Sequence, residues 1–177
     1  MSAVSEKHKF EAPKTVNFCI LICSSSRYEK LMRGELPEDE SGDLIIQILR
    51  RHGHRIVSRK VLPDDREQIQ RAVLKALKSR KVDAIITCGG TGISPRDVTI
   101  EAVRLVLDKE LEGFGEIFRR LSYDAIGSAA ILSRALAGVS SKKVIFCIPG
   151  SPQAVSIAVE NLIAPEVGHI LAHAREE

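Results

Sequence analysis

Three almost wholly apolar runs most constrain what this chain can fold into. They occupy residues 16–23 (VNFCILIC), 83–88 (DAIITC) and 143–148 (KVIFCI). Continuous apolar runs are typical of strands buried on both faces, which occur in parallel sheets covered by helices. A fourth, partly exposed strand is predicted at residues 54–62. The chain is therefore expected to belong to the α/β class.

Helical patterns separate the predicted strands. Helices are predicted over residues 41–52, 64–77 and 99–107, then up to residue 121, over 128–136, and from Pro152 onward. The expected N-caps are Ser41 or Asp43 for the first helix, Asp64 with Glu67 three residues later for the second, and Ser151 for the last. Breaks are expected at the loop of residues 28–40 and at the glycines of residues 113–115, and Pro165 is expected to kink or break the last helix. The alternation predicts a mostly parallel central sheet with helices on both faces.

Composition excludes several classes of protein. A length of 177 residues suits one domain, and a formal net charge of +3 is too small for a dedicated nucleic-acid binder. No uninterrupted apolar run reaches the roughly 18 residues that span a bilayer. Residues 1–13 lack the apolar segment of a signal peptide. We expect a cytoplasmic protein with no membrane attachment, and its four cysteines are interpreted as small core residues.

The third strand runs directly into a glycine loop, Gly89-Gly90-Thr91-Gly92. Glycines free the backbone to approach a ligand closely, and the amides of such a loop bind anions. The loop has neither the Walker spacing nor the dinucleotide-binding spacing. Two interpretations stay open: a site for a phosphorylated ligand, or a tight turn with a purely structural role.

Two aspartates near this loop also have two interpretations each. Asp97, in Ser94-Pro95-Arg96-Asp97, is placed near the start of a helix, where the helix dipole favours a carboxylate. Asp64 is a good N-cap. Alternatively, both carboxylates bind a Mg²⁺ ion that bridges phosphates, since Mg²⁺ prefers one or two carboxylates plus substrate oxygens.

Other polar residues give weaker signals. Ser133 and Arg134 either face solvent or reach a phosphate. His169 and His173 have the spacing of a metal-binding pair on a helix, but no third ligand lies within reach along the sequence.

Taken together, six blocks in the same order and spacing resemble those of a known family. They read LPDD (62–65), TCGGTG (87–92), SPRDVTIEA (94–102), GFGE (113–116), LSRA (132–135) and IPGSP (148–152). The chain resembles the molybdenum-cofactor biosynthesis domain of the MogA/MoaB type, and MoaB is the favoured branch. The similarity covers residues 13–173. It implies a single three-layer α/β domain at residues 14–175, preceded by a flexible N-terminal arm at residues 1–13.

The resemblance also implies an activity. It is adenylyl transfer from MgATP to the terminal phosphate of molybdopterin, with release of pyrophosphate. Family members form homotrimers or homohexamers and pass their product to a molybdate-inserting enzyme. ATP and molybdopterin are then substrates, Mg²⁺ accompanies them, and no tightly bound cofactor is expected. Three alternatives stay open: a non-catalytic molybdopterin-binding scaffold, the molybdate-inserting enzyme itself, and a nucleotide hydrolase with the same anion loop.

The family's functional positions carry over block by block. Asp64 and Asp97 match its catalytic carboxylates, and our hypothesis is that they hold or orient Mg²⁺. The substrate-binding positions match Gly89, Gly90, Thr91, Gly92, Ser133, Arg134, Pro149, Gly150, Ser151 and Pro152. One block departs from the pattern: the first loop reads Ser24-Ser25-Ser26-Arg27, where relatives commonly carry Ser-Asp, so the role of that aspartate has no bearer here.

Overall fold

The computed structural model describes residues 12–176 and forms one six-stranded sheet with the strand order β2-β1-β3-β6-β5-β4. The strands are β1 (Asn17–Cys23), β2 (Arg55–Leu62), β3 (Ala84–Cys88), β4 (Lys109–Glu110), β5 (Leu136–Ser140) and β6 (Lys143–Ile148). The first three strands and β6 pair in parallel, whereas β5 pairs antiparallel with β6 and β4 with β5. The predicted α/β class and mostly parallel sheet are confirmed.

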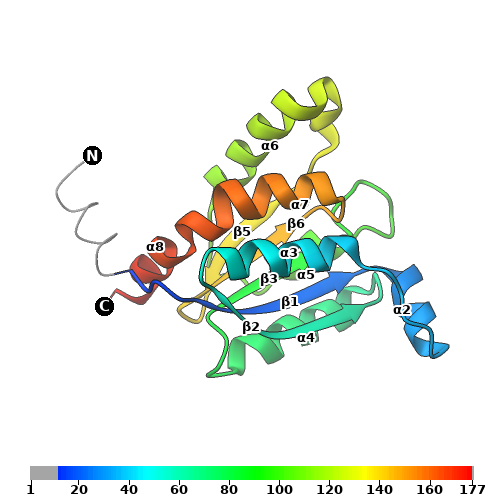
Figure 1. Ribbon diagram of the computed structural model, residues 1–177, viewed down its shortest axis with the longest axis horizontal. Helices are drawn as coiled ribbons and strands as arrows, with labels where there is room; N and C mark the ends of the chain where they lie inside the picture. Colours follow the sequence, from blue (N-terminus) through cyan, green and yellow to red (C-terminus); the bar gives the residue numbers. More distant parts are fainter. Residues whose placement is uncertain (1–11, 177) are drawn as a thin grey trace.

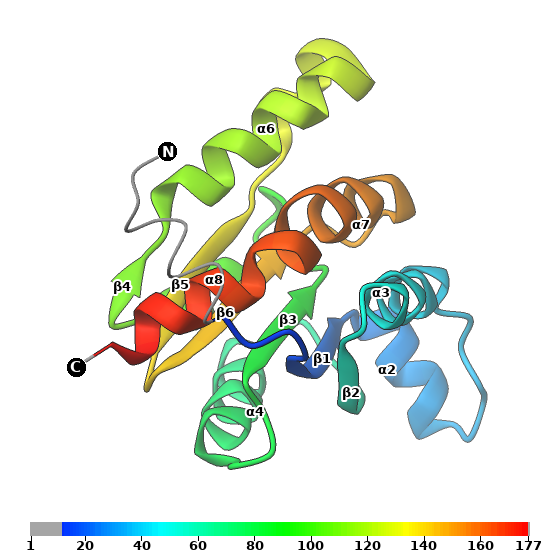
Figure 2. The same ribbon diagram turned by 60° about the vertical axis from the view of Figure 1, so that its left-hand side comes forward.

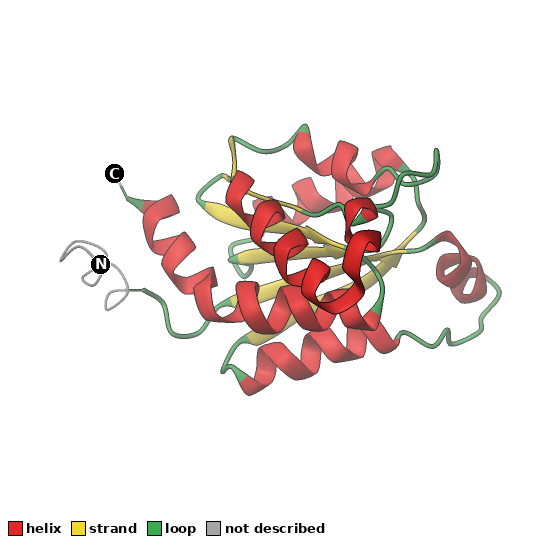
Figure 3. Cartoon of the chain, turned by 90° about the horizontal axis from the view of Figure 1, so that it is seen from above, coloured by secondary structure: helices red, strands yellow, loops and turns green. Residues whose placement is uncertain are grey.

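Helices cover both faces of this sheet (Figures 1 and 3). They are α2 (Ser25–Met32), α3 (Glu40–Arg51), α4 (Arg66–Lys78), α5 (Thr99–Arg104), α6 (Glu112–Ile126), the 3₁₀ helix η1 (Gly127–Leu132), α7 (Pro152–Ala158), the π-helical turn η2 (Val159–Ile163) and α8 (Ala164–Arg175). One layer contains α3, α6, α7 and α8, and the other contains α4 and α5 (Figure 2). The predicted three-layer sandwich is therefore correct.

The central strand β1 shows why the sheet is apolar on both faces. Phe18, Ile20 and Ile22 belong to the core under α3 and α7, whereas Leu21 and Cys23 belong to the core under α4. Successive side chains of a strand point to opposite faces, so a strand between two helical layers needs apolar residues at every position.

The four cysteines are free and buried, as predicted. Burial raises the pKa of Cys23, Cys88 and Cys147 to about 12. Their thiols therefore stay protonated at neutral pH, and these residues pack as small apolar side chains.

Several predicted boundaries were wrong. Residues 25–32, partly assigned to a loop, form α2, which has no buried residue and therefore leaves no apolar period in the sequence. The N-cap of α3 is Asp39, not Ser41 or Asp43, and the N-cap of α4 is Asp65, not Asp64. The predicted glycine break at residues 113–115 lies inside α6.

The segment predicted as a helix at residues 128–136 forms η1 followed by strand β5. Its alanines and leucines favour a helix by intrinsic propensity. Pairing with β6 overrides that preference through a tight turn at Ser141 and Lys142, where φ is 53° and 60°. Neither residue is the Asn or Gly that usually signals such a turn in a sequence.

Pro165 does not break the last helix. The helix runs without interruption from Pro152 to Arg175, and the π-helical turn η2 directly before Ala164 accommodates the missing N–H of the proline. This helix of 24 residues is long and apolar enough to cross a membrane by length and composition alone. Its fully buried residues Val155, Val159 and Val167 pack in the core of the domain, so it is the core helix of this fold.

The predicted N-terminal arm lies largely outside the described residues. Of residues 1–13, only Ala12 and Pro13 are described. Both are half-buried next to Gly168 on α8, where a Cβ would lie 2.6 Å from the Pro13 carbonyl oxygen.

Candidate active site

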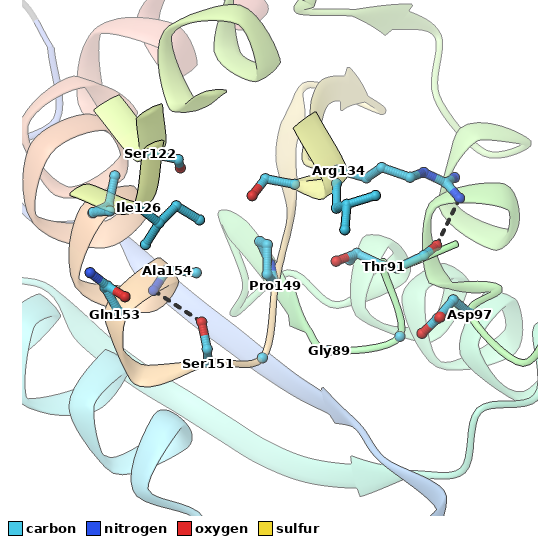
Figure 4. Close-up of a pocket in the computed structure, with 16 residues that line it drawn as sticks. Gly89, Thr91, Asp97, Ser122, Ile126, Arg134, Pro149, Ser151, Gln153 and Ala154 are labelled. Carbon is cyan, nitrogen blue, oxygen red and sulfur yellow. Dashed lines mark hydrogen bonds between the residues drawn. The ribbon is translucent and has the colours of Figure 1, made fainter. Parts of the chain in front are cut away.

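Three loops meet at the carboxyl edge of the sheet, where β1, β3 and β6 end. Ligands of parallel α/β sheets bind at this edge. A cavity of about 340 Å³ opens between the loop after β3 and the loop after β6 (Figure 4). Its lining includes most of the predicted site residues: Gly89, Gly90, Thr91, Gly92, Asp97, Ser133, Arg134, Pro149, Gly150 and Ser151. Two predicted residues, Asp64 and Pro152, do not line it.

The glycine loop is held by backbone contacts to its neighbours. Gly89 N–H donates to the Ile148 carbonyl at 3.0 Å, and Thr99 N–H donates to the Gly90 carbonyl at 3.0 Å. Gly89 and Gly90 have φ values of +98° and +61°. A Cβ at Gly89 would collide with the Cys23 carbonyl oxygen. Only glycine fits both requirements, so the loop lies tightly on the end of β1 while its other side faces the cavity.

Asp64 contacts the start of α2. Its Oδ2 accepts hydrogen bonds from the Ser25 backbone N–H at 2.8 Å and from the Ser25 hydroxyl at 2.9 Å. Its Oδ1 lies 3.0 Å from the position that a Cβ on Gly90 would take. Asp65, one residue later, caps α4 by accepting from Gln68 N–H at 2.8 Å. The capping role predicted for Asp64 is therefore filled by its neighbour.

Asp97 lies on the other side of the glycine loop. Its Oδ2 accepts from Ser94 N–H at 2.9 Å and lies 2.7 Å from the position of a Cβ on Gly92. The predicted position inside the first turn of a helix was wrong, because α5 begins only at Thr99. Asp97 instead closes a turn before that helix and borders the cavity (Figure 4). The two aspartates thus flank the loop, with Asp64 beside Gly90 and Asp97 beside Gly92.

Arg134 is not solvent-facing, but joins the glycine loop to α5. Its Nη1 donates to the Gly92 carbonyl at 2.9 Å (Figure 4), and its Nη2 pairs with Glu101. Burial raises the pKa of Glu101, but the hydrogen bond and charge of Arg134, the backbone hydrogen bond and the charge of Arg104 together outweigh it, so this pKa lies below its ordinary value. The guanidinium is already committed to these two partners, and Ser133 precedes it on the cavity wall.

The loop after β6 forms the opposite wall. Ser151 caps α7 by accepting from Ala154 N–H at 3.3 Å, and Pro152 occupies the first helical position, both as predicted. The Ser41 hydroxyl, from α3, donates to the Gly150 carbonyl at 2.7 Å and fixes this turn.

Comparison with known proteins agrees with this arrangement. Residues 19–169 match the family model described as "Probable molybdopterin binding domain". The chain belongs to this family. It is 48% identical over 165 residues to molybdenum cofactor biosynthesis protein B of Bacillus cereus, covering 93% of this chain and 94% of that protein. It is 45% identical over 175 residues to the molybdopterin adenylyltransferase of Pyrococcus furiosus, covering 97% and 98%.

Solved structures of family members share the fold. The crystal structure of a molybdenum cofactor biosynthesis protein B has a TM-score of 0.85 at 46% identity, covering 94% of this chain and 99% of that one. The tungsten cofactor synthesizing protein MoaB from Pyrococcus furiosus has a TM-score of 0.81 at 44% identity, covering 93% and 100%.

Hard oxygen atoms near the loop fit a Mg²⁺ ion. Among residues 12–176, no group of three or more His, Cys, Asp or Glu side chains could hold a metal by itself. Mg²⁺ does not need one, because it binds one or two carboxylates together with substrate phosphates. Asp64 and Asp97 would supply the carboxylates. In addition, the fully buried Thr99 hydroxyl beside Gly90 has no hydrogen-bond partner among the described residues. His169 and His173 lie on α8, with their Nε2 atoms 3.0 Å apart, and belong to no such group.

Sequence reasoning missed two kinds of site residue. Ser25 and Ser41 reach the site through contacts with Asp64 and Gly150, which depend on strand register and on α3 packing. The remaining lining residues, which form the side of the cavity away from Asp97, are Ser122, Ile126, Leu132, Gln153, Ala154 and Ile157. Their spacing in the sequence is that of ordinary helical residues, so no local signal distinguishes them.

Proposed function

We propose that this protein catalyses adenylyl transfer from MgATP to the terminal phosphate of molybdopterin in molybdenum cofactor biosynthesis. The observation that carries the proposal is the convergence of the glycine loop, Asp97, Ser133 and the Pro-Gly turn on one cavity, with Asp64 behind the loop. The Pyrococcus furiosus relative, matched over 97% of this chain, is named for this activity.

The reaction needs positioning more than acid–base chemistry. An oxygen of the molybdopterin phosphate monoester attacks the α-phosphorus of ATP, a new P–O–P bond forms, and the bond to the β-phosphate oxygen breaks as pyrophosphate leaves. The attacking phosphate is already anionic near neutral pH, so no general base is required. The chain's task is to hold two polyanions in line.

Charge in the cavity supports a metal-dependent reaction. Arg134 is the lining residue with a positive charge, and it is already paired with Glu101. Favourable interactions with phosphate must then come from the amides of residues 89–92 and from a cation that arrives with the nucleotide. Mg²⁺, held by Asp64 and Asp97, would neutralise phosphate charge and stabilise the leaving pyrophosphate.

The remaining predicted residues take complementary roles in this proposal. The Thr91 hydroxyl and the glycine amides bind phosphate or polar pterin groups, and Ser133 binds the molybdopterin phosphate. Arg134 keeps the loop in its binding conformation by holding the Gly92 carbonyl. Pro149, Gly150 and Ser151 shape the facing wall.

We further propose that residues 14–175 form the working domain of a cytoplasmic homotrimer or homohexamer that hands its product to a molybdate-inserting enzyme. Three large apolar side chains on and after α6 support self-association, because Ile117, Tyr123 and Ile131 are 53%, 58% and 84% exposed. Light scattering on the purified protein tests this, and a monomer at micromolar concentration would contradict it.

One assay tests the proposed activity. The purified protein is incubated with MgATP and molybdopterin, and adenylylated molybdopterin and pyrophosphate are quantified by chromatography. Both products are expected in equal amounts, and omission of Mg²⁺ should abolish them. Molybdopterin binding without product would instead indicate a carrier. Consumption of ATP without molybdopterin would indicate a nucleotide hydrolase.

A further inference from the structure

The start of α2 grips the carboxylate of Asp64. Ser25 is the first residue of this helix, and Ser24 is its N-cap. Ser25 donates to Asp64 Oδ2 twice, from its backbone N–H at 2.8 Å and from its hydroxyl at 2.9 Å. In return, Asp64 N–H donates to the Ser25 hydroxyl oxygen at 2.9 Å. Three hydrogen bonds therefore join these two residues.

Strand register makes this contact. Cys23 at the end of β1 pairs with Leu62 at the end of β2. Ser25 and Asp64 each follow two residues after this pair, so the two parallel strands deliver them side by side. The Ser24 N–H donates to the Leu62 carbonyl at 2.9 Å and extends the ladder to the first residue beyond β1. The contact is thus built between two hydrogen-bonded strand ends.

The contact with Ser25 gives the two carboxylate oxygens of Asp64 different surroundings. All the hydrogen bonds of the Asp64 carboxylate within residues 12–176 go to Oδ2. Oδ1 is thereby turned toward Gly90, 3.0 Å from the position that a Cβ there would take. An aspartate side chain that is free to rotate would spread its two oxygens over several orientations. Ser25 removes this freedom and presents one chosen oxygen to the glycine loop.

We infer that Ser25 is a positioning residue, which fixes Asp64 so that Oδ1 faces the cation accompanying the nucleotide. This inference rests on the role proposed above for Asp64. Ser25 itself is not among the residues that line the cavity, so it acts through Asp64 and not on the ligand. The segment after β1 contains no carboxylate at this point. The Ser25 hydroxyl lies there and donates to the carboxylate of Asp64.

The rival explanation is that Ser25 only ties α2 to the sheet. The chain offers a matched control, because Ser26 lies on the same exposed turn and its hydroxyl is 3.2 Å from that of Ser24, away from Asp64. Ser25→Ala removes the hydroxyl but keeps the backbone donor. Ser25→Thr retains a hydroxyl. The three single variants therefore separate loss of the contact from a general disturbance of α2.

The experiment measures cation binding independently of turnover. Mn²⁺, as a spectroscopic substitute for Mg²⁺, is titrated into the full-length protein with α,β-methylene-ATP, which cannot be cleaved between its α- and β-phosphates. Free Mn²⁺ is read by electron paramagnetic resonance. Ser25→Ala should weaken Mn²⁺ binding about tenfold, the order expected for one hydrogen bond to a charged group. Ser25→Thr and Ser26→Ala should bind like the wild type.

A double-mutant cycle decides whether the effect passes through Asp64. In an Asp64→Ala background, Ser25→Ala should cause no further loss, because the residue it acts through is gone. An equal loss in both backgrounds, or an equal loss with Ser26→Ala, would overturn the inference, as would a wild type that binds no Mn²⁺. Melting temperatures of all variants report on folding. If the wild type makes no adenylylated molybdopterin but the cycle gives the expected coupling, the proposed reaction fails while the positioning role stands.

Discussion

Asp64 and Asp65 are adjacent acidic residues with different contacts, and substitutions should separate their roles. Asp65 is exposed and caps α4 by accepting a hydrogen bond from Gln68 N–H. Within residues 12–176, its side chain makes no hydrogen bond to a residue that lines the cavity. Asp64 receives two hydrogen bonds from Ser25 and turns Oδ1 to the glycine loop. We predict that Asp65→Ala lowers stability without lowering activity, and that Asp64→Asn does the reverse.

The magnitudes follow from these contacts. Loss of an N-cap side chain costs about 1 kcal/mol, which lowers the melting temperature of a chain of this length by about 2–4 °C. Asp65→Asn keeps a capping oxygen and should be neutral. In Asp64→Asn, the amide oxygen can still accept both bonds from Ser25, so the free energy of unfolding should stay within about 0.5 kcal/mol of wild type. The lost charge should reduce kcat for adenylylation about a hundredfold.

The two quantities are measured on the same preparations. Urea unfolding followed by circular dichroism gives the free energy of unfolding, and single-turnover formation of adenylylated molybdopterin gives the rate. The reasoning is refuted if Asp64→Asn loses stability and activity in proportion, as a cap would. It is also refuted if Asp65→Ala reduces the rate while the protein remains folded at the assay temperature.

Three further predictions concern the loop and the core. Arg134→Lys keeps the charge but cannot hold both partners of the guanidinium, so kcat/KM should fall about tenfold, while Arg120→Lys, on the exposed face of α6, should not change it. Gly90→Ala should cost more unfolding free energy than Gly53→Ala. Both have positive φ, at about 1–2 kcal/mol each, but only a Cβ at Gly90 meets Thr99 and the Asp64 carboxylate. Burial lowers the pKa of His54, so the unfolded chain takes up the proton first as the pH falls. Urea unfolding should therefore show stability complete above pH ~6.5 and declining below it, by at most about 1.4 kcal/mol per unit, and a His54→Phe variant should lack this slope.

The elements that were predicted well from the sequence are those whose pattern of apolar residues reflects their burial. β1, β3 and β6 are apolar at almost every position because helices cover both faces. The start of α7 is marked by Ser151 and Pro152, a cap and a first-turn residue that act locally. In contrast, α2 has no buried residue, and β5 is stabilised by pairing with its neighbours in the sheet. The residues of these two elements therefore show no pattern that would predict them.

The candidate site divides in the same way. The glycine loop and Asp97 were located from motif and resemblance, because the backbone conformation needs glycine at fixed positions. The N-cap of α4 was predicted at Asp64 but is Asp65, one residue later. The register of β2 decides which of these two adjacent aspartates begins the helix. The clamp formed by Arg134 and the grip of Ser25 join segments 42 and 39 residues apart in the chain, and no local pattern encodes such a contact.

For the proposed reaction, these contacts would hold the glycine loop ready for anionic substrates. Arg134 donates a hydrogen bond to the Gly92 carbonyl of the loop. Thr99 N–H donates to the Gly90 carbonyl, and Gly89 packs against the end of β1. The loop is therefore fixed before any ligand arrives, and binding energy is not spent on ordering it. Among the described residues that line the cavity, Arg134 is the one cationic side chain, and it is already paired with Glu101 and the Gly92 carbonyl. A divalent cation bound to a nucleotide would bring positive charge to the carboxylates on either side of the loop, whereas a bare phosphate would not. Cation binding is therefore the most direct test of the site.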